Sequence, residues 1–199
     1  MSLFSTVDRS SSARRRAARR IAAGCAIYRA GSEGLAWRVH SGAVRLDANT
    51  LDGHGAFASL AIAGDIVGCE TMLFGTYTFS ATALTDCRLT PWPEGGGEPA
   101  GESLLASLAR AQQRAADVVA LRGGQAVDRV VGLIRLLADG AGQVVLPTRH
   151  DIADITDLRF ETISRIIKSL ERAGVLEAVR IEGVHATRGY AVDAALLRV

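Results

Sequence analysis

Charged, hydroxyl and carboxylate side chains recur every three or four residues between positions 159 and 173. The members of this polar set are Glu161, Ser164, Arg165, Lys168 and Arg172. Isoleucine and leucine lie between them, also three or four residues apart, and this spacing predicts an amphipathic helix with an exposed polar face. Arginine can donate two hydrogen bonds to guanine, a carboxylate can accept one from cytosine, and serine can contact a base edge or a methyl group. This chemistry suits a helix that reads DNA bases, and we assign base contacts to Glu161, Ser164 and Arg165.

Other side chains near this helix suit the DNA backbone better than the bases. Lys168 and Arg172 lie further along the helix than Arg165, where side chains reach phosphates. The predicted phosphate contacts are Arg159, Lys168, Arg172, Thr148 and Arg149. The competing interpretation is an exposed helix face held by a Glu161–Arg165 ion pair, which would contribute only about 0.2–0.5 kcal/mol.

The flanking residues predict a winged helix-turn-helix. Thr148 and Asp151 have the spacing of a helix N-cap and its third residue, and Ile152 and Ile155 would form the buried side of this first helix. The segment 175–192 has the texture of a β-hairpin and is the natural place for a wing. Its candidate turn residues are Gly183 and Gly189. Its candidate backbone contacts, for which solvent exposure is an equal alternative, are Arg180, His185 and Arg188.

Glycines punctuate the upstream half of the chain. Between Cys25 and Pro91 they separate short runs of β-branched and aromatic residues, at 26–29, 36–40, 43–46, 56–60, 77–81 and 87–90. Many short strands with glycine turns predict a small antiparallel barrel or roll. Residues 91–101, with three prolines and three consecutive glycines, predict a loop or hinge. The arginine-rich residues 14–20 favour a short helix, either a solvated face or an arm that contacts phosphates.

Two helices are predicted between the roll and the helix-turn-helix. Apolar residues in the first follow the 4-3-4-3 spacing of a short coiled coil. These residues are Leu104, Leu108, Ala111, Ala115 and Val118. The pattern favours a dimer interface over packing within one chain, and Gly123–Gly124 would end the helix. The apolar residues expected to face inward in the second helix are Val127, Val130, Val131, Ile134 and Leu137.

Composition narrows the classes of function. The chain has 199 residues, of which 48% are hydrophobic, and this suffices for one or two domains with real cores. A net charge of +2 is not that of a polycation, so DNA affinity must come from where the charges sit. Three widely spaced cysteines, with no signal-peptide pattern and no membrane-length apolar stretch, fit a cytoplasmic protein. No nucleophile elbow, Walker-type loop or metal-spaced His/Cys set is present, and we expect neither enzyme activity nor a metal site.

The order of these parts resembles that of bacterial transcription regulators of the Crp/Fnr family across nearly the whole chain. The residues that carry the resemblance are 37–46, 64–68 and 79–84 in the roll, and 148–153 and 161–168 near the C-terminus. The resemblance implies an α+β fold with three parts. These are an N-terminal antiparallel β-roll of the cyclic-nucleotide-binding kind (1–98), a long dimerisation helix (99–124) and a C-terminal winged helix-turn-helix (125–199). It also implies a homodimer on double-stranded DNA, and contact with RNA polymerase if the regulator activates transcription.

Within the family, Glu-x-x-Ser-Arg resembles the Fnr-type reader, which implies TTGAT-like half-sites in an inverted repeat. Phe160 stands where the cyclic-AMP subgroup has an arginine, and this favours the Fnr-like branch. Arg159 occupies the usual serine or threonine cap, and Asp157 replaces the usual turn glycine, so the helix start is expected to be less well capped. These departures leave open an interaction module that no longer binds specific DNA.

The input signal of the roll is less well specified. A family-type cyclic-nucleotide site needs a glutamate directly after the Gly-Asp-x-x-Gly turn and an arginine for the phosphate. Cys69 and Phe79–Ser80 occupy these positions, so no cyclic nucleotide is expected. The clustered thiolates of a [4Fe–4S] site are also missing. A haem site stays open, with candidate ligands His40, His54, Met72, Cys69 and Cys87. So does a thiol switch at Cys25, Cys69 or Cys87.

Overall fold

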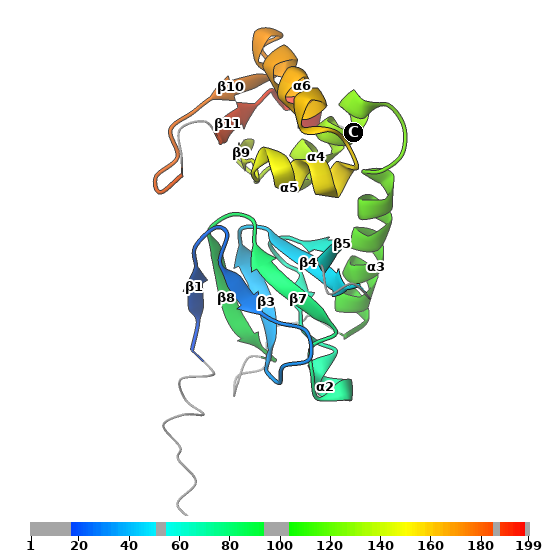
Figure 1. Ribbon diagram of the computed structural model, residues 1–199. Helices are drawn as coiled ribbons and strands as arrows, with labels where there is room; N and C mark the ends of the chain where they lie inside the picture. Colours follow the sequence, from blue (N-terminus) through cyan, green and yellow to red (C-terminus); the bar gives the residue numbers. More distant parts are fainter. Residues whose placement is uncertain (1–16, 51–54, 94–103, 185–187, 198–199) are drawn as a thin grey trace, which may run out of the picture.

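Two four-stranded antiparallel sheets form the lower lobe of the computed structural model, which describes residues 17–50, 55–93, 104–184 and 188–197 (Figure 1). One sheet has the strand order β1-β8-β3-β6 and the other β2-β7-β4-β5. The elements of this lobe are β1 (Arg19–Ile21), β2 (Ala26–Tyr28), β3 (Ala36–Ser41), β4 (Val44–Asn49), β5 (Gly55–Ala61), β6 (Ile66–Val67), α2 (Thr71–Phe74), β7 (Phe79–Ala83) and β8 (Cys87–Trp92). The predicted antiparallel β-roll is confirmed.

Alternation along the strands places one apolar face of each sheet inward. In β3, Trp37 and Val39 are buried, whereas His40 and Ser41 are exposed. The turn that follows needs a glycine, because Gly42 has a φ of +87° and a Cβ atom there would collide with the carbonyl oxygen of Asp86. The roll therefore has a core of its own between the two sheets.

Two predictions at the ends of the roll are wrong. Arg19 and Arg20 lie in β1 and not in a helix, because β1 pairs with β8. The expectation for residues 14–16 lies outside the described residues. Pro91 and Trp92, expected in a loop, complete β8 beside β3. A proline is compatible with this position because β1 pairs with β8 only as far as Leu89, so no neighbour needs its missing N–H.

The upper lobe is mainly helical. Its elements are α4 (Ala126–Leu137), β9 (Gln143–Val145), α5 (Arg149–Thr156), α6 (Phe160–Arg172), β10 (Leu176–Ala178), β11 (Gly189–Val192) and α7 (Ala194–Leu197). The strands form a sheet of order β10-β11-β9, so the predicted wing hairpin is present. Gly183, with a φ of +78°, lies in its turn, whereas Gly189 is a strand residue and not the predicted turn. Val127 is 40% exposed, so its predicted inward position is also wrong.

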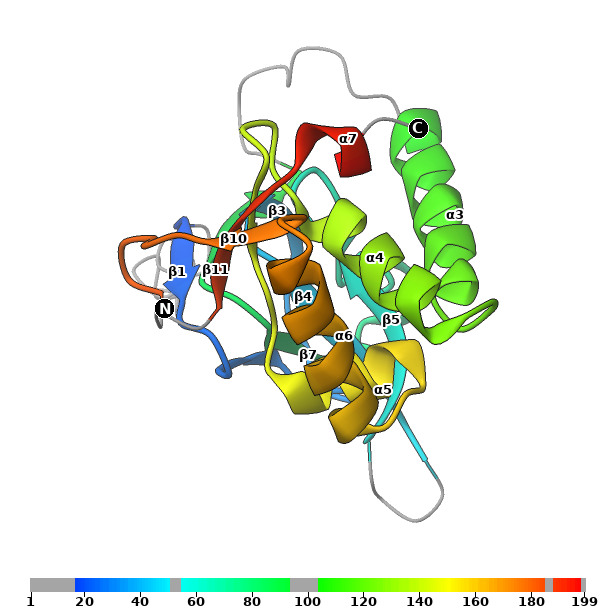
Figure 2. The same cartoon turned by 90° about the horizontal axis from the view of Figure 1, so that it is seen from above.

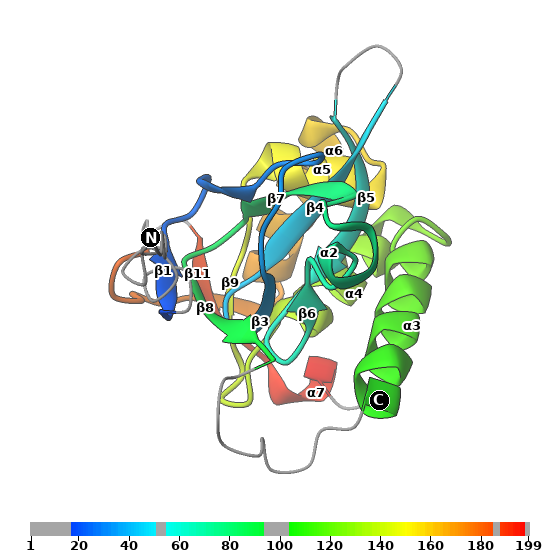
Figure 3. The ribbon, with the colours of Figure 1, turned by 90° about the horizontal axis from the view of Figure 1, so that it is seen from below.

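A long helix, α3 (Leu104–Ala120), runs beside the roll and leads to the upper lobe (Figures 1 and 3). Nε of Arg114 donates to the buried carboxylate of Asp65 at 2.9 Å, which fixes one side of the helix against the roll. Leu108, at 61% exposure, and the exposed Ala111 and Ala115 face outward. Within the described ranges, no helix is long and apolar enough to cross a membrane.

The predicted dimer contact at Val118 needs correction. Val118 is buried in the core of its own chain, and the neighbouring Val119, at 73% exposure, takes the outward position. The reason is geometric: a straight α-helix drifts by about 20° per heptad against a 3.5-residue repeat, so the outward-facing position shifts by one residue at the end of α3. We call Leu108, Ala111, Ala115 and Val119 the outer stripe of α3.

Candidate nucleic-acid interface

The first helix of the helix-turn-helix, α5, begins at a threonine cap. The backbone N–H of Asp151 donates to Oγ1 of Thr148 at 3.2 Å, and the Thr148 hydroxyl donates to the Asp151 carboxylate at 2.5 Å. This confirms the predicted capping spacing. Ile152 and Ile155 are buried, also as predicted. Because the single O–H of Thr148 is already donated to Asp151, the Thr148 side chain has no second proton to donate to a phosphate.

The turn between α5 and α6 depends on an aspartate. Asp157 has a φ of 53°, in the left-handed region, where aspartate is tolerated better than branched residues. In the described part of the chain it is the only residue other than glycine with a positive φ. Arg159 then occupies the N-cap of α6, and its side chain makes no capping hydrogen bond. The expectation of a weakly capped helix start is confirmed.

The second helix, α6, separates its apolar and polar residues cleanly. Ile163, Ile167 and Leu170 are buried in the core of the upper lobe. The side chains of the opposite face, which are exposed except for the half-buried Ser164, are Glu161, Ser164, Arg165, Lys168 and Arg172. Figures 1 and 2 place α6 on the side of its lobe that faces away from the roll.

The polar side chains of α6 are not committed to contacts within the chain. Among the described residues, Glu161 and Arg165 share no ion pair, and neither side chain has a hydrogen-bonding partner. The same holds within those ranges for Lys168 and Arg172. The competing interpretation of this face, a Glu161–Arg165 pair, therefore has no support in the geometry. The side chains of Glu161, Arg165, Lys168 and Arg172 are therefore available to contact the groove of a DNA duplex.

Two further predicted contacts are partly occupied. Arg149 is half-buried and lies close to the hydroxyl of Tyr190. The pKa of Tyr190 is raised, because burial and the hydrogen bond to Glu171 outweigh the lowering effect of Arg149. In the wing, Arg188 donates to the carbonyl oxygens of Leu146 at 2.7 Å and Leu84 at 2.9 Å. Arg188 therefore joins the wing to the roll and is not free for phosphate. Arg180 is exposed, and His185 lies outside the described residues.

Phe160, at the first position of α6, has a structural contact that the sequence did not indicate. Its ring is tilted against the imidazole of His150 on α5, with centroids 5.0 Å apart. The phenylalanine is nevertheless 42% exposed. An aromatic pair therefore joins α5 and α6 next to the uncapped start of the recognition helix.

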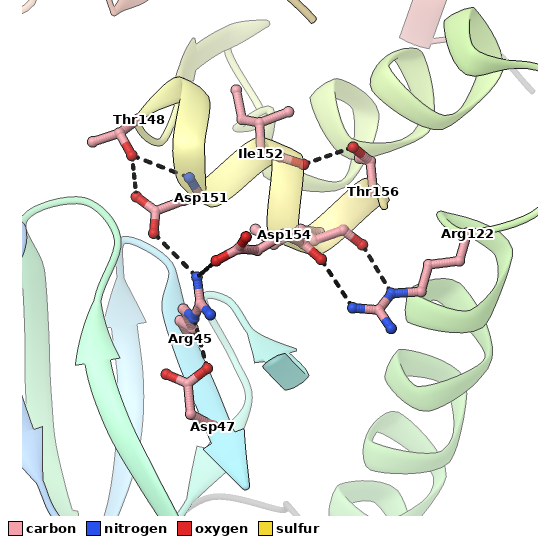
Figure 4. A network of polar contacts seen from close by, with 9 residues as sticks. Arg45, Asp47, Arg122, Thr148, Asp151, Ile152, Asp154 and Thr156 are labelled. Atoms are coloured by element: carbon pink, nitrogen blue, oxygen red, sulfur yellow. Dashed lines mark hydrogen bonds and ion pairs between the residues drawn. The ribbon is translucent and has the colours of Figure 1, made fainter. Parts of the chain in front are cut away.

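A network of polar contacts between the two lobes was also missed from the sequence (Figure 4). Arg45 on β4 lies between its strand neighbour Asp47, at 2.7 Å, and two carboxylates of α5, Asp154 at 2.7 Å and Asp151 at 3.4 Å. Burial opposes the charged guanidinium, but the hydrogen bonds to Asp154 and Asp47 outweigh it and raise the pKa of Arg45. No local signal marked Arg45, because the two aspartates of α5 are more than a hundred residues away in the chain.

The connection between α3 and α4 contacts the last turn of the same helix. Arg122 donates to the carbonyl oxygens of Asp154 at 2.9 Å and Ile155 at 3.2 Å (Figure 4). The guanidinium carbons of Arg122 and Arg45 lie 5.2 and 5.7 Å from the ring centroid of Phe57 on β5. An aromatic ring of the roll thus contacts both arginines that hold α5. We call Arg45, Phe57 and Arg122 the α5 clamp.

Two aromatic side chains stack within the core of the roll. The rings of Tyr28 and Tyr77 are stacked with centroids 3.7 Å apart, and both residues are buried. Tyr77 also packs so closely on Gly68 that a Cβ atom there would lie 2.6 Å from the ring. Residues 64–81 contain no lysine or arginine, and Glu70 accepts the N–H of Thr78 at 3.2 Å. This segment itself therefore offers no positive charge to a cyclic phosphate.

The candidate haem and thiol residues differ in their surroundings: Cys25 and Cys69 are exposed, whereas Cys87 is buried. Nε2 of His40 is hydrogen-bonded to Thr90 at 2.8 Å, and Met72 is 58% exposed on α2. Burial, with Asp86 nearby, raises the pKa of Cys87 to about 11, and burial with Glu70 nearby raises that of Cys69. Over the described residues, no three His, Cys, Asp or Glu side chains are grouped so as to hold a metal ion. His54 lies outside these ranges.

Comparison with known proteins identifies both lobes. Residues 18–96 match the cyclic nucleotide-binding domain family, and residues 128–186 match the Crp-like helix-turn-helix domain family. The nitrogen fixation regulation protein FixK of Rhizobium meliloti is 29% identical over 145 residues, which are 70% of this chain and 68% of that protein. The FixK protein of Bradyrhizobium diazoefficiens is 33% identical over 159 residues, 72% of this chain and 66% of that protein. The matched segment thus spans about two thirds of these relatives.

A solved structure extends the likeness to the whole fold. A transcriptional regulator of the CRP family from Thermus thermophilus superposes with a TM-score of 0.66 and is 26% identical. The superposition covers 90% of this chain and 94% of that one. The predicted fold class, an antiparallel β-roll followed by a helix-turn-helix domain, is therefore confirmed.

Proposed function

The chain belongs to the Crp/Fnr family of transcription regulators, and from this premise we propose that it binds inverted-repeat DNA as a homodimer through α6. Glu161, Ser164 and Arg165 contact bases of TTGAT-like half-sites, and Lys168, Arg172 and Arg159 contact phosphates. The observation that carries this proposal is the polar face of α6, whose charged side chains are exposed and unpaired among the described residues. Such a protein acts in the bacterial cytoplasm, and it contacts RNA polymerase if it activates transcription.

The homodimer follows from the geometry of the DNA site. Two recognition helices related by a two-fold axis read half-sites about 34 Å apart. The outer stripe of α3 offers an apolar surface for the second copy, with Leu108 at 61% and Val119 at 73% exposure. Its two alanines would allow close approach of the paired helices.

We further propose that DNA binding needs no cyclic nucleotide. The stacked Tyr28–Tyr77 pair and the absence of a cation from residues 64–81 support this. The raised pKa values of Cys69 and Cys87 weigh against a thiol switch at these two sites, because the thiolate is the reactive form.

A binding assay with variants of the reading face tests the proposal. Fluorescence anisotropy would compare a duplex carrying two TTGAT-like half-sites with a duplex of scrambled sequence. We expect Arg165→Ala to weaken specific binding by about 1–3 kcal/mol and to relax the preference at one guanine. Arg180→Ala, at an exposed wing residue, is the control for loss of one positive charge. Equal affinity of the unaltered protein for both duplexes at low salt would favour an interaction module that does not read DNA.

A further inference from the structure

We infer that Arg45 and Arg122 are positioning residues for DNA binding, because they fasten α5 to the roll and to the end of α3 and so hold α6 in one orientation. This inference rests on the proposed function and adds how the recognition helix is presented. Neither arginine belongs to the polar face of α6.

Arg45 makes the first attachment, between β4 and α5. Its side chain is only 13% exposed. Of the two α5 carboxylates that it contacts, Asp154 at 2.7 Å is 55% exposed and Asp151 at 3.4 Å is 25% exposed. Because the guanidinium is largely shielded from solvent, these contacts are screened less than contacts between two fully exposed side chains. Asp47 lies on the same strand and keeps the guanidinium directed at α5 (Figure 4). Asp151 belongs to the N-terminal cap of α5, so the attachment acts on a rigid part of that helix.

Arg122 makes the second attachment, to the backbone of the last turn of α5, where Arg45 also contacts the side chain of Asp154. Its guanidinium donates to two carbonyl oxygens of the last helical turn, where the helix dipole is negative. Because Arg122 follows α3 directly, this contact joins α5 to the helix that carries the outer stripe. The two arginines approach α5 from the roll and from the end of α3, and two attachments restrict its rotation better than one attachment would.

Holding α5 also holds α6, since the two helices share one core. Ile155 of α5 and Ile163 of α6 are both fully buried in the same cluster. Figures 1 and 2 place α6 on the side of the upper lobe away from the roll, and the charged side chains of its polar face are exposed. This orientation is therefore open to DNA, and loss of the clamp would let the upper lobe adopt others.

The first test measures the orientation of the lobes without DNA. A fluorescent dye pair on Cys25 and on an introduced Ser169→Cys, in a Cys69→Ser background, reports the distance between roll and α6, since both sites are exposed and Cys87 is buried. Labelled chains are diluted into excess unlabelled protein so that each particle carries one pair. We expect one narrow distance distribution, broadened by Arg45→Gln, by Arg122→Gln and most by both. Arg88→Gln, which removes the same charge from an exposed site on β8, should leave it narrow.

The second test measures affinity for the inverted-repeat duplex. If the reading-competent orientation becomes a fraction of the population, the apparent affinity falls by that fraction, and we expect a loss of about five- to tenfold. The relative preference among bases stays unchanged, because Glu161 and Arg165 are intact. Asp154→Ala is the second variant, since this side chain is 55% exposed and its removal breaks the 2.7 Å contact without disturbing a core.

The outcomes separate this inference from the proposed function. If the distance distribution broadens in the Arg45 and Arg122 variants but the unaltered protein binds no DNA, the clamp is supported and the DNA-binding proposal is overturned. Narrow distances in every variant, or broadened distances with unchanged or tighter DNA binding, would overturn the positioning role while leaving DNA binding intact.

Discussion

At the scale of single residues, the left-handed turn at Asp157 joins α5 to α6. Aspartate tolerates a φ of 53° because its short polar side chain can hydrogen-bond locally, whereas a β-branched side chain collides with the backbone. The turn is also close to the uncapped start of α6 at Arg159. The direction in which the chain enters α6 thus depends on the backbone conformation of the exposed Asp157.

Replacement of Asp157 should therefore follow backbone preference. We expect Asp157→Val to lower the free energy of unfolding by about 1–2 kcal/mol, and Asp157→Gly to leave it within about 0.5 kcal/mol, because only glycine adopts this φ freely. Urea unfolding followed by circular dichroism measures both. Asp157→Asn is the matched control, since it removes the charge and keeps the tolerance for positive φ. Equal stability of the Val and Asn variants would contradict the assignment.

Lys168 offers a second residue-scale prediction, concerning salt. The side chain is exposed one turn beyond Ser164 and has no partner among the described residues. Each phosphate contact steepens the dependence of log K on log salt by about 0.9, so Lys168→Ala should flatten the slope by about 1.8 for the two chains of a dimer. Affinity falls for specific and scrambled duplexes alike. Anisotropy titrations at several salt concentrations would measure the slope, and a loss confined to one base position would instead make Lys168 a base contact.

At the scale of elements, the sequence predicted the structures that depend on neighbouring residues and missed those that depend on residues far apart in the chain. The apolar face of α6 was foreseen because Ile163 and Ile167 repeat within one helix, and the cap of α5 because its two partners lie three residues apart. Strand β1 was mistaken for a helix because its pairing partner, β8, is more than sixty residues away. The α5 clamp was not predicted for the same reason, since nothing near Arg45 in the sequence indicates a contact with Asp154.

The outer stripe of α3 makes a prediction about assembly. Leu108→Glu together with Val119→Glu places like charges opposite one another in the proposed dimer, which should cost about 3 kcal/mol or more and raise the dimer dissociation constant at least about a hundredfold. Sedimentation velocity across a range of concentrations measures it. Ala109→Glu, at an exposed position on another side of α3, should leave the dimer intact. A dimer as stable as before in the double variant would place the interface elsewhere.

At the scale of the whole molecule, a roll of the cyclic-nucleotide-binding type carries a reading lobe and is itself packed with aromatic side chains. Tyr28 and Tyr77 are stacked and buried in the core of the roll. The lobes are also joined by the α5 clamp and by Arg188, which reaches the carbonyl oxygen of Leu84. Contacts within the chain itself therefore join the two lobes.

This arrangement predicts that thermal stability is indifferent to cyclic nucleotides. A ligand at a hundred times its dissociation constant would stabilise the folded chain by about 2.7 kcal/mol and raise its Tm by several degrees. We expect millimolar cyclic AMP or cyclic GMP to shift the Tm by no more than the same concentration of linear AMP does, because residues 64–81 offer no cation to the cyclic phosphate. Differential scanning fluorimetry measures the shift, and anisotropy with the inverted-repeat duplex measures affinity under the same conditions. A Tm increase of a few degrees that only a cyclic nucleotide produces, accompanied by tighter DNA binding, would show that the packed roll opens to a ligand.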